Sequence, residues 1–303
     1  MFSTRTGVAR LSLLVVISLV VLKVAVAIVT GSLSIIAQAA DSFLDLFAVA
    51  VIFFAIGIAT KPADDKHPFG HGKVEDIAAV VQALLIVTAG GLIIYSAVRR
   101  MISEVTIEMT GAGIGVMLFS IIVSIFLSRH LLRVSRATDS IALEAMAHNI
   151  AADVYSAAAV LAGLIAIYFT GISILDPIIA LLVALFILKV AYDVMKKSYG
   201  GLMDVRLSEV EEAEIQSCIV EHYSELVSFH KLRTRKAGSQ RYIDLHLVMP
   251  KNTTVEEAHQ LCDHLEEDIK TRLLDASVTI HVEPCNMECD QCSVSCNLRK
   301  RSH

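Results

Sequence analysis

The chain has 303 residues, of which 55% are hydrophobic and 19% charged, and its mean hydropathy is +0.63. This hydropathy is far above that of an ordinary soluble domain, so the composition predicts a polytopic membrane protein. The formal net charge of −5 is small and the basic residues are scattered, which gives no case for nucleic-acid binding.

Six apolar segments are each long enough to cross a bilayer, which takes about 20 helical residues. They cover residues 9–30, 33–59, 76–98, 111–128, 142–169 and 177–195. The first is too long for a signal-peptide core, so we interpret it as a span. With both termini in the cytoplasm, the outer loops hold only Arg99 and Arg100. The inner segments then hold Arg5, Arg10, Lys61, Lys66, Lys73, Arg129, Arg133, Arg136, Lys196 and Lys197. We therefore expect a multi-pass protein of the cell inner (plasma) membrane with cytoplasmic termini.

The second apolar segment carries two ionisable side chains, Asp41 and Asp45. Because they are four residues apart, they share one face of a helix. A carboxylate at the bilayer centre costs at least about 2.5–3.5 kcal/mol on insertion scales, and two on one face also repel each other. Packing against partner helices is one explanation for the pair. A bound cation, which supplies the missing positive charge, is the other.

The fifth apolar segment carries Asn149 and Asp153, which are also four residues apart. With Asp41 and Asp45 they form two pairs of oxygen ligands on two helices, a plausible tetrahedral cage for a divalent ion. His148 lies about 100° around the helix from Asn149. A hydrogen-bonded packing pair is the alternative for the second pair, but two such pairs in one bundle favour a cation site.

The loop after the second segment reads PADDKHPFGHGK from Pro62 to Lys73. Asp64, His67 and His71 could bind a metal ion together with water at the cytoplasmic face. The spacing alone is weak evidence, because polar loops rich in glycine and proline are common.

After Gly200 the chain becomes charged and predicts a small domain of order αββαβ. An acidic helix starts at the capping residue Ser208, and a second helix covers about Thr254–Leu273. Strands are predicted over Val227–Arg235, Arg241–Val248 and Ser277–Val282, with a hairpin turn at Ala237–Ser239. We divide the chain into a transmembrane domain over 1–204, a cytoplasmic domain over 205–284 and a cysteine-rich tail over 285–303.

Motifs along nearly the whole chain resemble those of the cation diffusion facilitator family. They are GSLSIIAQAADSFLD in the second segment, PADDKHPFGHGKVE in the loop, HNIAADVYSAAAVLAG in the fifth segment, GLMD after the sixth, and HKLRTRKAG, DLHLVMP, AH and HVEPC in the cytoplasmic domain. Together and in this order they are highly specific. The chain is similar in particular to the YiiP-like zinc and ferrous-iron efflux antiporters of bacteria.

The resemblance implies a homodimer whose protomers have six transmembrane helices followed by a cytoplasmic ferredoxin-like α+β domain that pairs across the dimer. It implies a transport site at Asp41, Asp45, Asn149 and Asp153, and a loop site at Asp64, His67 and His71. It implies a binuclear metal site, with zinc expected, at His230, His246, His259, His281 and Glu283. It also implies a charge interlock between Lys73 and Asp204.

The cytoplasmic histidines also support a metal site when judged from the residues alone. Imidazole is the commonest neutral metal ligand, and His246 and His281 lie on predicted strands while His230 begins one. A single strand histidine is usually an ordinary surface residue. Four histidines and Glu283, at a position where the family usually has Asp, make that interpretation less attractive.

Asn149 departs from the family pattern, which usually has His at this position. The resulting all-oxygen donor set is harder, which favours Mn²⁺ or Fe²⁺ relative to Zn²⁺ compared with the usual site, although the Irving–Williams order still allows zinc. Because Asn does not titrate, proton exchange would be carried by Asp41, Asp45 and Asp153.

The end of the chain holds a cluster of cysteines with spacings of four, three and four: Cys285, Cys289, Cys292 and Cys296. Four close thiolates suit Zn²⁺, Cu⁺ or an Fe–S cluster. Redox-active or incidental thiols are the alternative.

These patterns predict the efflux of a divalent transition-metal cation from the cytoplasm by proton antiport with alternating access. The alternative is a metal-sensing or assembly protein of the same architecture with weak transport activity. An enzyme would need a nucleophile–base constellation or a metal-activated water at a substrate pocket, and the loops contain neither. A channel would need a polar stripe through several spans, whereas the polar groups here lie at one level.

Overall fold

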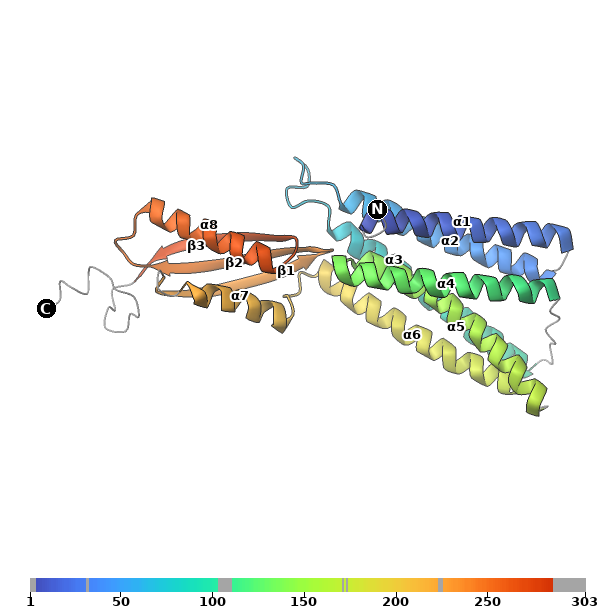
Figure 1. The fold of residues 1–303 in the computed structure, drawn as a ribbon. Helices are drawn as coiled ribbons and strands as arrows, with labels where there is room; N and C mark the ends of the chain where they lie inside the picture. The colour runs from blue at the N-terminus through green and yellow to red at the C-terminus, as the bar shows by residue number, and fades with distance from the viewer. Residues whose placement is uncertain are drawn as a thin grey trace. The chain divides into compact units, whose positions relative to one another are not determined.

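The computed structural model describes residues 4–30, 33–102, 111–170, 172, 174–222 and 226–285 (Figure 1). Within these ranges, the side chains of residues 30, 33–38, 40–41, 111–114, 161 and 164–168 lie outside the description. The chain divides into two compact units, Met1–Leu202 and Met203–His303.

The first unit is a bundle of long helices. Their bounds are α1 (Arg5–Thr30), α2 (Leu33–Ala59), α3 (Lys73–Ile102), α4 (Gly111–Thr138), α5 (Ile141–Thr170) and α6 (Leu175–Leu202). Among the described residues, α1, α2, α3, α4 and α6 contain stretches long and apolar enough to cross a membrane. The remaining helix of the bundle, α5, has 30 residues and carries the predicted pair Asn149 and Asp153.

Several helices run beyond the predicted apolar segments. The helix α4 continues to Thr138 and α6 to Leu202, whereas the apolar runs end near residues 128 and 195. An apolar run marks the part of a helix that sits in hydrocarbon, but backbone hydrogen bonds continue into the polar region. On this extension of α4, Leu131 and Val134 are buried while Arg133 is exposed, so the extra turns are amphipathic.

The helices of the bundle pack mostly as sequence neighbours. The helix α1 lies along α2, α5 lies against α4 and α6, and α3 lies along α6. Small residues allow close approach at the α3–α5–α6 contacts, where Ala79, Ala83 and Ala145 pack together. A larger core, which includes Val8, Ile52, Leu131 and Met146, joins α1, α2, α4 and α5.

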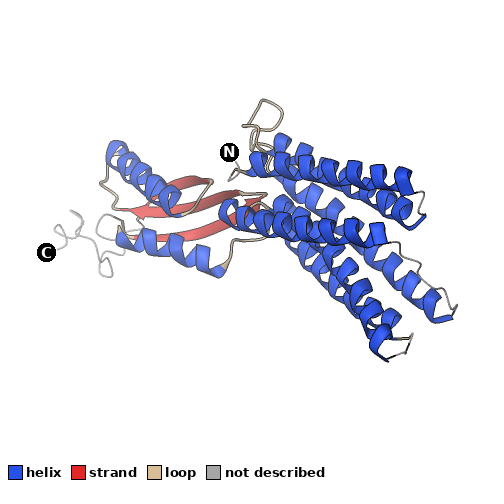
Figure 2. Cartoon of the chain, turned by 45° about the vertical axis from the view of Figure 1, so that its right-hand side comes forward, coloured by secondary structure: helices blue, strands red, loops and turns tan. Residues whose placement is uncertain are grey.

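The second unit has a three-stranded sheet with two helices, in the order α7, β1, β2, α8, β3 (Figure 2). The bounds are α7 (Glu209–Glu221), β1 (Ser228–Ala237), β2 (Gln240–Met249), α8 (Val255–Arg272) and β3 (Ala276–Pro284). The strand β2 is central, antiparallel to β1 and parallel to β3. The predicted order αββαβ is therefore confirmed.

Alternation along β2 separates a covered face from an open one. Ile243, Leu245 and Leu247 are buried against apolar residues of α7 and α8, such as Ile219 and Leu265. The residues between them, including His246, are only partly buried and belong to the opposite face. The helices therefore cover one side of the sheet, and His246 lies on the other.

Local signals in the sequence fix the ends of these elements. Ser208 and Thr254 each cap a helix and form a capping box with Glu211 and Glu257. The hairpin between β1 and β2 turns at Gly238, whose φ of 61° is a conformation that suits glycine.

Candidate functional site

The helical bundle contains a partly open cavity of about 390 Å³ that brings two predicted ligands to one space. Asp45 of α2 and Asp153 of α5 both line it, together with residues of α1, α3 and α4. Ser42, Ser120 and Ser156 add hydroxyl groups to the lining. Two carboxylates from two helices, with hydroxyl groups around them, form an oxygen-rich environment of the kind that divalent cations use.

Two basic side chains also line this cavity. Lys23 of α1 donates a hydrogen bond from Nζ to Ser42 Oγ at 2.6 Å. Arg100 of α3 forms an ion pair with Asp176 of α6, with Nη1 3.0 Å from Oδ2. The described lining thus carries both carboxylates and cationic groups.

The other two predicted transport ligands are Asn149 and Asp41. The residues that line the cavity do not include Asn149, which is 8% exposed and lies one turn before Asp153 on α5. Its Nδ2 is buried and has no hydrogen-bond partner among the described residues. Asp41 belongs to α2, but its side chain lies outside the described residues. The full set of four ligands stays a prediction.

His148, the residue next to Asn149, has a partner on its own helix. Its Nε2 lies 3.8 Å from Glu144 Oε1, and Lys197 of α6 lies 2.5 Å from the same oxygen. This contact agrees with the expectation that His148 points away from the Asp153 face.

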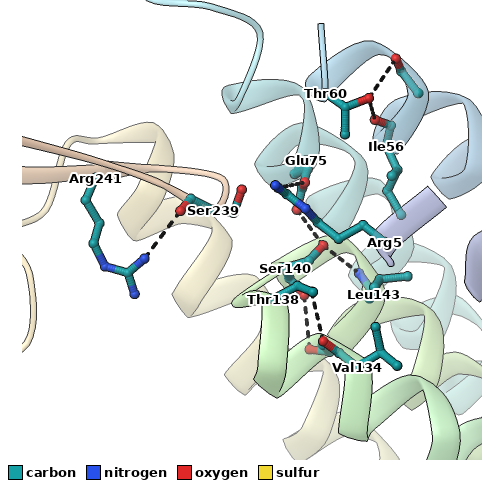
Figure 3. Close-up of polar contacts among 12 residues, drawn as sticks. Arg5, Ile56, Thr60, Glu75, Val134, Thr138, Ser140, Leu143, Ser239 and Arg241 are labelled. Atoms are coloured by element: carbon teal, nitrogen blue, oxygen red, sulfur yellow. Dashed lines mark hydrogen bonds and ion pairs between the residues drawn. The ribbon is translucent and has the colours of Figure 1, made fainter. Parts of the chain in front are cut away.

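A buried polar network joins α1, α3 and the start of α5 at one end of the bundle (Figure 3). Glu75 is 1% exposed and accepts hydrogen bonds from Arg5 at 3.3 Å and from the Ser140 hydroxyl at 2.6 Å. Ser140 Oγ in turn accepts from the backbone N–H of Leu143 at 3.4 Å. The network fixes the relative positions of three helices that surround the cavity.

The loop between α2 and α3 brings its three predicted ligands together. One donor atom from each of Asp64, His67 and His71 can be chosen so that all three lie within 4.8 Å of one another. Asp64 Oδ1 lies 3.1 Å from His67 Nδ1, and Asp64 Oδ2 lies 3.5 Å from His71 Nε2. The backbone N–H of His67 donates to Asp64 at 2.7 Å, and this bond holds the pKa of the Asp64 carboxyl below its ordinary value.

The open face of the sheet carries a row of histidines. His230 pairs with His246 across β1 and β2, and His246 pairs with His281 across β2 and β3. Because each pair is in register, the three imidazoles stand side by side, with ring centroids 5.4 Å and 4.7 Å apart. A β-bulge follows His230, and Lys231 adopts a φ of 52° there.

Glu283 lies beside this row and completes a compact donor set. Its Oε1 is 2.7 Å from His246 Nδ1, and its Oε2 is 3.3 Å from His230 Nε2. The hydrogen bond from His246 holds the pKa of Glu283 below its ordinary value, and the nearby charge of His230 contributes. His281 Nε2 is 3.8 Å from the same carboxylate. Two imidazoles and a carboxylate within 4.8 Å of one another suit a transition-metal ion such as zinc.

The other residues that the family resemblance implies have contacts of their own. His259 is exposed on α8 and lies 3.6 Å from Asp263 on the same helix, in the layer that covers the opposite side of the sheet. Lys73 donates to the Leu202 carbonyl at 3.4 Å, and Asp204 accepts from Arg235 at 3.1 Å. The interlock of Lys73 with Asp204 stays a prediction.

Only the first cysteine of the predicted tail cluster lies within the described residues. Cys285 is buried, has a free thiol, and donates its backbone N–H to the Met249 carbonyl at 2.9 Å. Cys289, Cys292 and Cys296 lie outside the described residues, so metal binding by the tail stays a prediction.

Sequence reasoning missed two polar residues inside the bundle. Lys23 is a charged residue in the first apolar segment, and an intramembrane charge of this kind is itself a signal of function. Gln82 of α3 is fully buried, and neither polar atom of its amide has a hydrogen-bond partner among the described residues. It stands in an apolar helix, so its sequence context also marked it as unusual.

Comparisons with known proteins cover the chain from the first helix to the last strand. Residues 9–203 match the cation efflux transmembrane domain, and residues 207–285 match the cytoplasmic domain of cation efflux proteins. The chain is 31% identical over 280 residues to the cation-efflux pump FieF of Shewanella oneidensis, which covers 92% of this chain and 94% of that protein.

The cation-efflux pump of a second organism matches over a similar length of the chain. The cation-efflux pump FieF of Salmonella typhi is 33% identical over 258 residues, covering 85% of each chain. Among solved structures, that of a putative zinc transporter, CzrB, is 37% identical and covers 26% of this chain and 99% of its own, with a TM-score of 0.26. Because the two matched domains span nearly all of its residues, the chain belongs to the cation efflux family, the cation diffusion facilitators.

Proposed function

We propose that this protein exports a divalent transition-metal ion from the cytoplasm in exchange for protons. The ion binds in the cavity of the bundle, at Asp45 and Asp153 together with Asp41 and Asn149. Membership of a family of cation transporters, and not of enzymes, supports the export of a divalent cation. The main observation in support of this metal site is the cavity, because carboxylates of α2 and α5 both line it.

The chemistry of the donors determines how protons can be exchanged. A bound divalent ion requires ionised carboxylates, so metal entry releases protons from those that are protonated. The amide of Asn149 contributes an oxygen but carries no exchangeable charge. The protons that return when the metal leaves are therefore taken up by Asp41, Asp45 and Asp153.

Alternating access provides the transport step. The cavity opens to the cytoplasm to load metal and to the opposite side to release it, while the ligands stay at one level of the bundle. The protein functions as a homodimer in the inner (plasma) membrane with cytoplasmic termini. The excess of basic residues in the inner segments supports this orientation.

The donor set also bears on which metal is carried. Carboxylates and an amide are harder ligands than imidazole, and they accept Mn²⁺ and Fe²⁺ readily. We propose a site whose preference for Zn²⁺ over Mn²⁺ is weaker than that of a site with a histidine at position 149.

Reconstituted protein tests this function. In proteoliposomes, a pH gradient with the acidic side inside should drive uptake of Zn²⁺ or Mn²⁺ by the full-length protein. Asp153→Asn should reduce this uptake at least tenfold, because the variant loses both a ligand and an exchangeable proton. Asp193→Asn, at an exposed carboxylate of α6 that does not line the cavity, is the matched control and should transport like the parent.

Uptake that does not depend on the pH gradient would rule out proton exchange. Uptake by Asp153→Asn at the parental rate would show that the ion does not use the cavity carboxylates.

The cluster of His230, His246 and Glu283 supports a second candidate function within the same architecture. A metal ion held there would link β1, β2 and β3 and report the cytoplasmic metal concentration. A sensing or assembly protein would bind metal at this cluster and show only weak gradient-driven uptake. The proteoliposome assay therefore separates the two functions directly.

A further inference from the structure

We propose that Lys23 is the resident counter-cation of the transport site. Its ammonium group shares the cavity with Asp45 and Asp153 when no metal is bound, and an entering divalent ion displaces it. Lys23 thus competes with the metal and sets the affinity of the site. This inference rests on the proposed transport function and assigns a role to a residue that belongs to none of the predicted metal sites.

The position of Lys23 in the sequence is costly without a function. It stands in α1 within the apolar stretch VVLKVAV, seven residues before the helix ends at Thr30. A lysine in such a span carries a large insertion penalty, and it is retained where it faces a polar cavity or pairs with an acid. In this protein Lys23 is half-buried and lines the cavity that contains two carboxylates.

Its hydrogen bond places the ammonium close to the carboxylate face of α2. Lys23 Nζ donates to Ser42 Oγ at 2.6 Å, and Ser42 is 5% exposed. Ser42 precedes Asp45 by three residues, so the two lie on the same side of the helix, with Cβ atoms about 5–6 Å apart. The hydroxyl therefore holds the ammonium at the cavity wall, one helical turn from a predicted metal ligand.

The charges of the described lining explain why a cation is useful here. Without metal, Asp45 and Asp153 would place two negative charges in a region of low dielectric. The second cation in the lining, Arg100, is held by Asp176 on the neighbouring helix at 3.0 Å. Lys23 is bound only through a neutral hydroxyl in the contacts described, so its charge remains to balance the carboxylates.

The chemistry of lysine suits a group that an entering metal ion must displace. Its ammonium is a compact charge on a flexible four-carbon stem, so it can move along the cavity wall without movement of the helix. A divalent ion that reaches the carboxylates repels the ammonium, and departure of the ion lets the ammonium return. The returning charge favours release of the metal, which a transporter needs as much as it needs binding.

A structural role for Lys23 makes different predictions. If the hydrogen bond to Ser42 only joins α1 to α2, then removing either partner lowers stability and leaves metal affinity unchanged. If Lys23 competes with the metal, then removing its charge tightens binding. Removing the hydroxyl of Ser42 frees the ammonium to approach the carboxylates and weakens binding. The two single variants therefore shift the affinity in opposite directions.

The test is Zn²⁺ binding to full-length protein in detergent, measured by isothermal titration calorimetry. Asp153→Asn is titrated in parallel, and the binding that it loses defines the transport site. At that site Lys23→Met should lower Kd about tenfold or more, because one repelling charge has left the cavity. Lys23→Arg should stay near the parental Kd, and Ser42→Ala should raise it several-fold.

Controls connect the effect to the cavity. Lys189→Met removes the same charge from an exposed position on α6 that does not line the cavity, and it should leave the Kd unchanged. The double variant Lys23→Met/Ser42→Ala should bind like Lys23→Met, because Ser42 acts only through the ammonium. If Lys23→Met does not fold, the test uses Lys23→Gln, which should lower Kd, and Ser42→Ala, which should raise it.

The outcomes separate this inference from the proposed function. Parental or weaker binding by Lys23→Met, with Asp153→Asn still losing a site, would overturn the role of Lys23 alone. If Asp153→Asn loses no binding, then the transport site is not in this cavity, and the role of Lys23 fails together with it.

Discussion

The residue at position 149 would set the hardness of the donor set in the proposed transport site. Asn149 is buried on α5 one turn from Asp153, and its Nδ2 has no partner among the described residues. Replacement by histidine would offer an imidazole nitrogen in place of an amide oxygen. We expect Asn149→His to shift the preference from Mn²⁺ towards Zn²⁺ by about tenfold, because zinc favours nitrogen ligands more strongly.

Competition between Zn²⁺ and Mn²⁺ for the purified protein measures this shift. His148→Ala is the matched control, because its imidazole contacts Glu144 at 3.8 Å and not the cavity. Equal zinc preference in Asn149→His and the parent would show that position 149 does not supply a ligand.

At the scale of single elements, Glu211 links the start of α7 to the central strand. Its carboxylate accepts from the Ser208 hydroxyl at 2.7 Å and from Arg241 Nε at 2.8 Å. Burial raises the pKa of Glu211, but these hydrogen bonds outweigh burial and hold the pKa below its ordinary value. The carboxylate therefore stabilises the fold fully above the unfolded pKa of about 4.3, and this contribution is lost as pH falls through the lower folded pKa.

We therefore expect the cytoplasmic unit to lose stability below about pH 4.5, and Glu211→Gln to lose less of it on acidification than the parent. Peptide-resolved hydrogen exchange of α7 and β2 in the full-length protein measures this difference. Glu209→Gln, at a side chain that is 90% exposed, is the control and should follow the parent. An identical pH response in Glu211→Gln and the parent would mean that the link does not stabilise the unit.

Close contact between α5 and α6 depends on Gly163. A Cβ at this position would overlap Asp176 Oδ1 and would lie 3.0 Å from Asp176 Cα, which is backbone and cannot move freely. Asp176 also holds Arg100 of α3, so the helices must separate to accept a side chain here. We expect Gly163→Ala to lower the free energy of unfolding by about 1–3 kcal/mol.

Thermal unfolding in detergent measures this change. Gly91→Ala is the matched control, because a Cβ at Gly91 meets nothing within 4 Å, and its helix should tolerate or gain from alanine. A melting temperature for Gly163→Ala at or above that of Gly91→Ala would contradict the close packing.

Sequence patterns predicted the elements well where the signal is local. The alternation in β2, the glycine turn at Gly238 and the cap at Ser208 depend on neighbouring residues only, and each appears in the structure. Helix ends were less predictable, as in α4, because hydropathy reports the surroundings of a helix and not its hydrogen bonds.

The features that the sequence could not predict depend on tertiary packing and on strand register. Spacing put Asp45 and Asp153 on suitable helix faces, but only the packing of the bundle shows that both line one cavity with Lys23. The row of His230, His246 and His281 depends on strand register, which no spacing between distant histidines reveals. The family resemblance placed His259 in the predicted metal site of the cytoplasmic domain. In the structure His259 lies on α8, in the helical layer on the other side of the sheet from His246.

At the scale of the whole molecule, the cavity lined by Asp45 and Asp153 and the histidine row belong to different compact units. We therefore expect that mutation can remove binding at one site and leave binding at the other intact. In the proposed mechanism the cavity carboxylates exchange protons with the metal, whereas the cytoplasmic cluster combines imidazoles with Glu283. If the protein is a transporter with a regulatory site, mutation of one site should remove metal binding there and leave metal binding at the other site.

We expect His246→Ala to bind fewer zinc ions per protomer while proton release on metal addition to the cavity persists. Asp153→Asn should keep the cytoplasmic zinc and lose most of the cavity-dependent proton release, because one of its exchangeable carboxylates has gone. Calorimetry in two buffers of different ionisation enthalpy measures both quantities on the same full-length samples. His264→Ala, at an exposed histidine of α8 outside the cluster, is the control for His246→Ala. Parental proton release by Asp153→Asn would place the coupling elsewhere, and loss of all release in His246→Ala would show that the cytoplasmic unit controls the cavity.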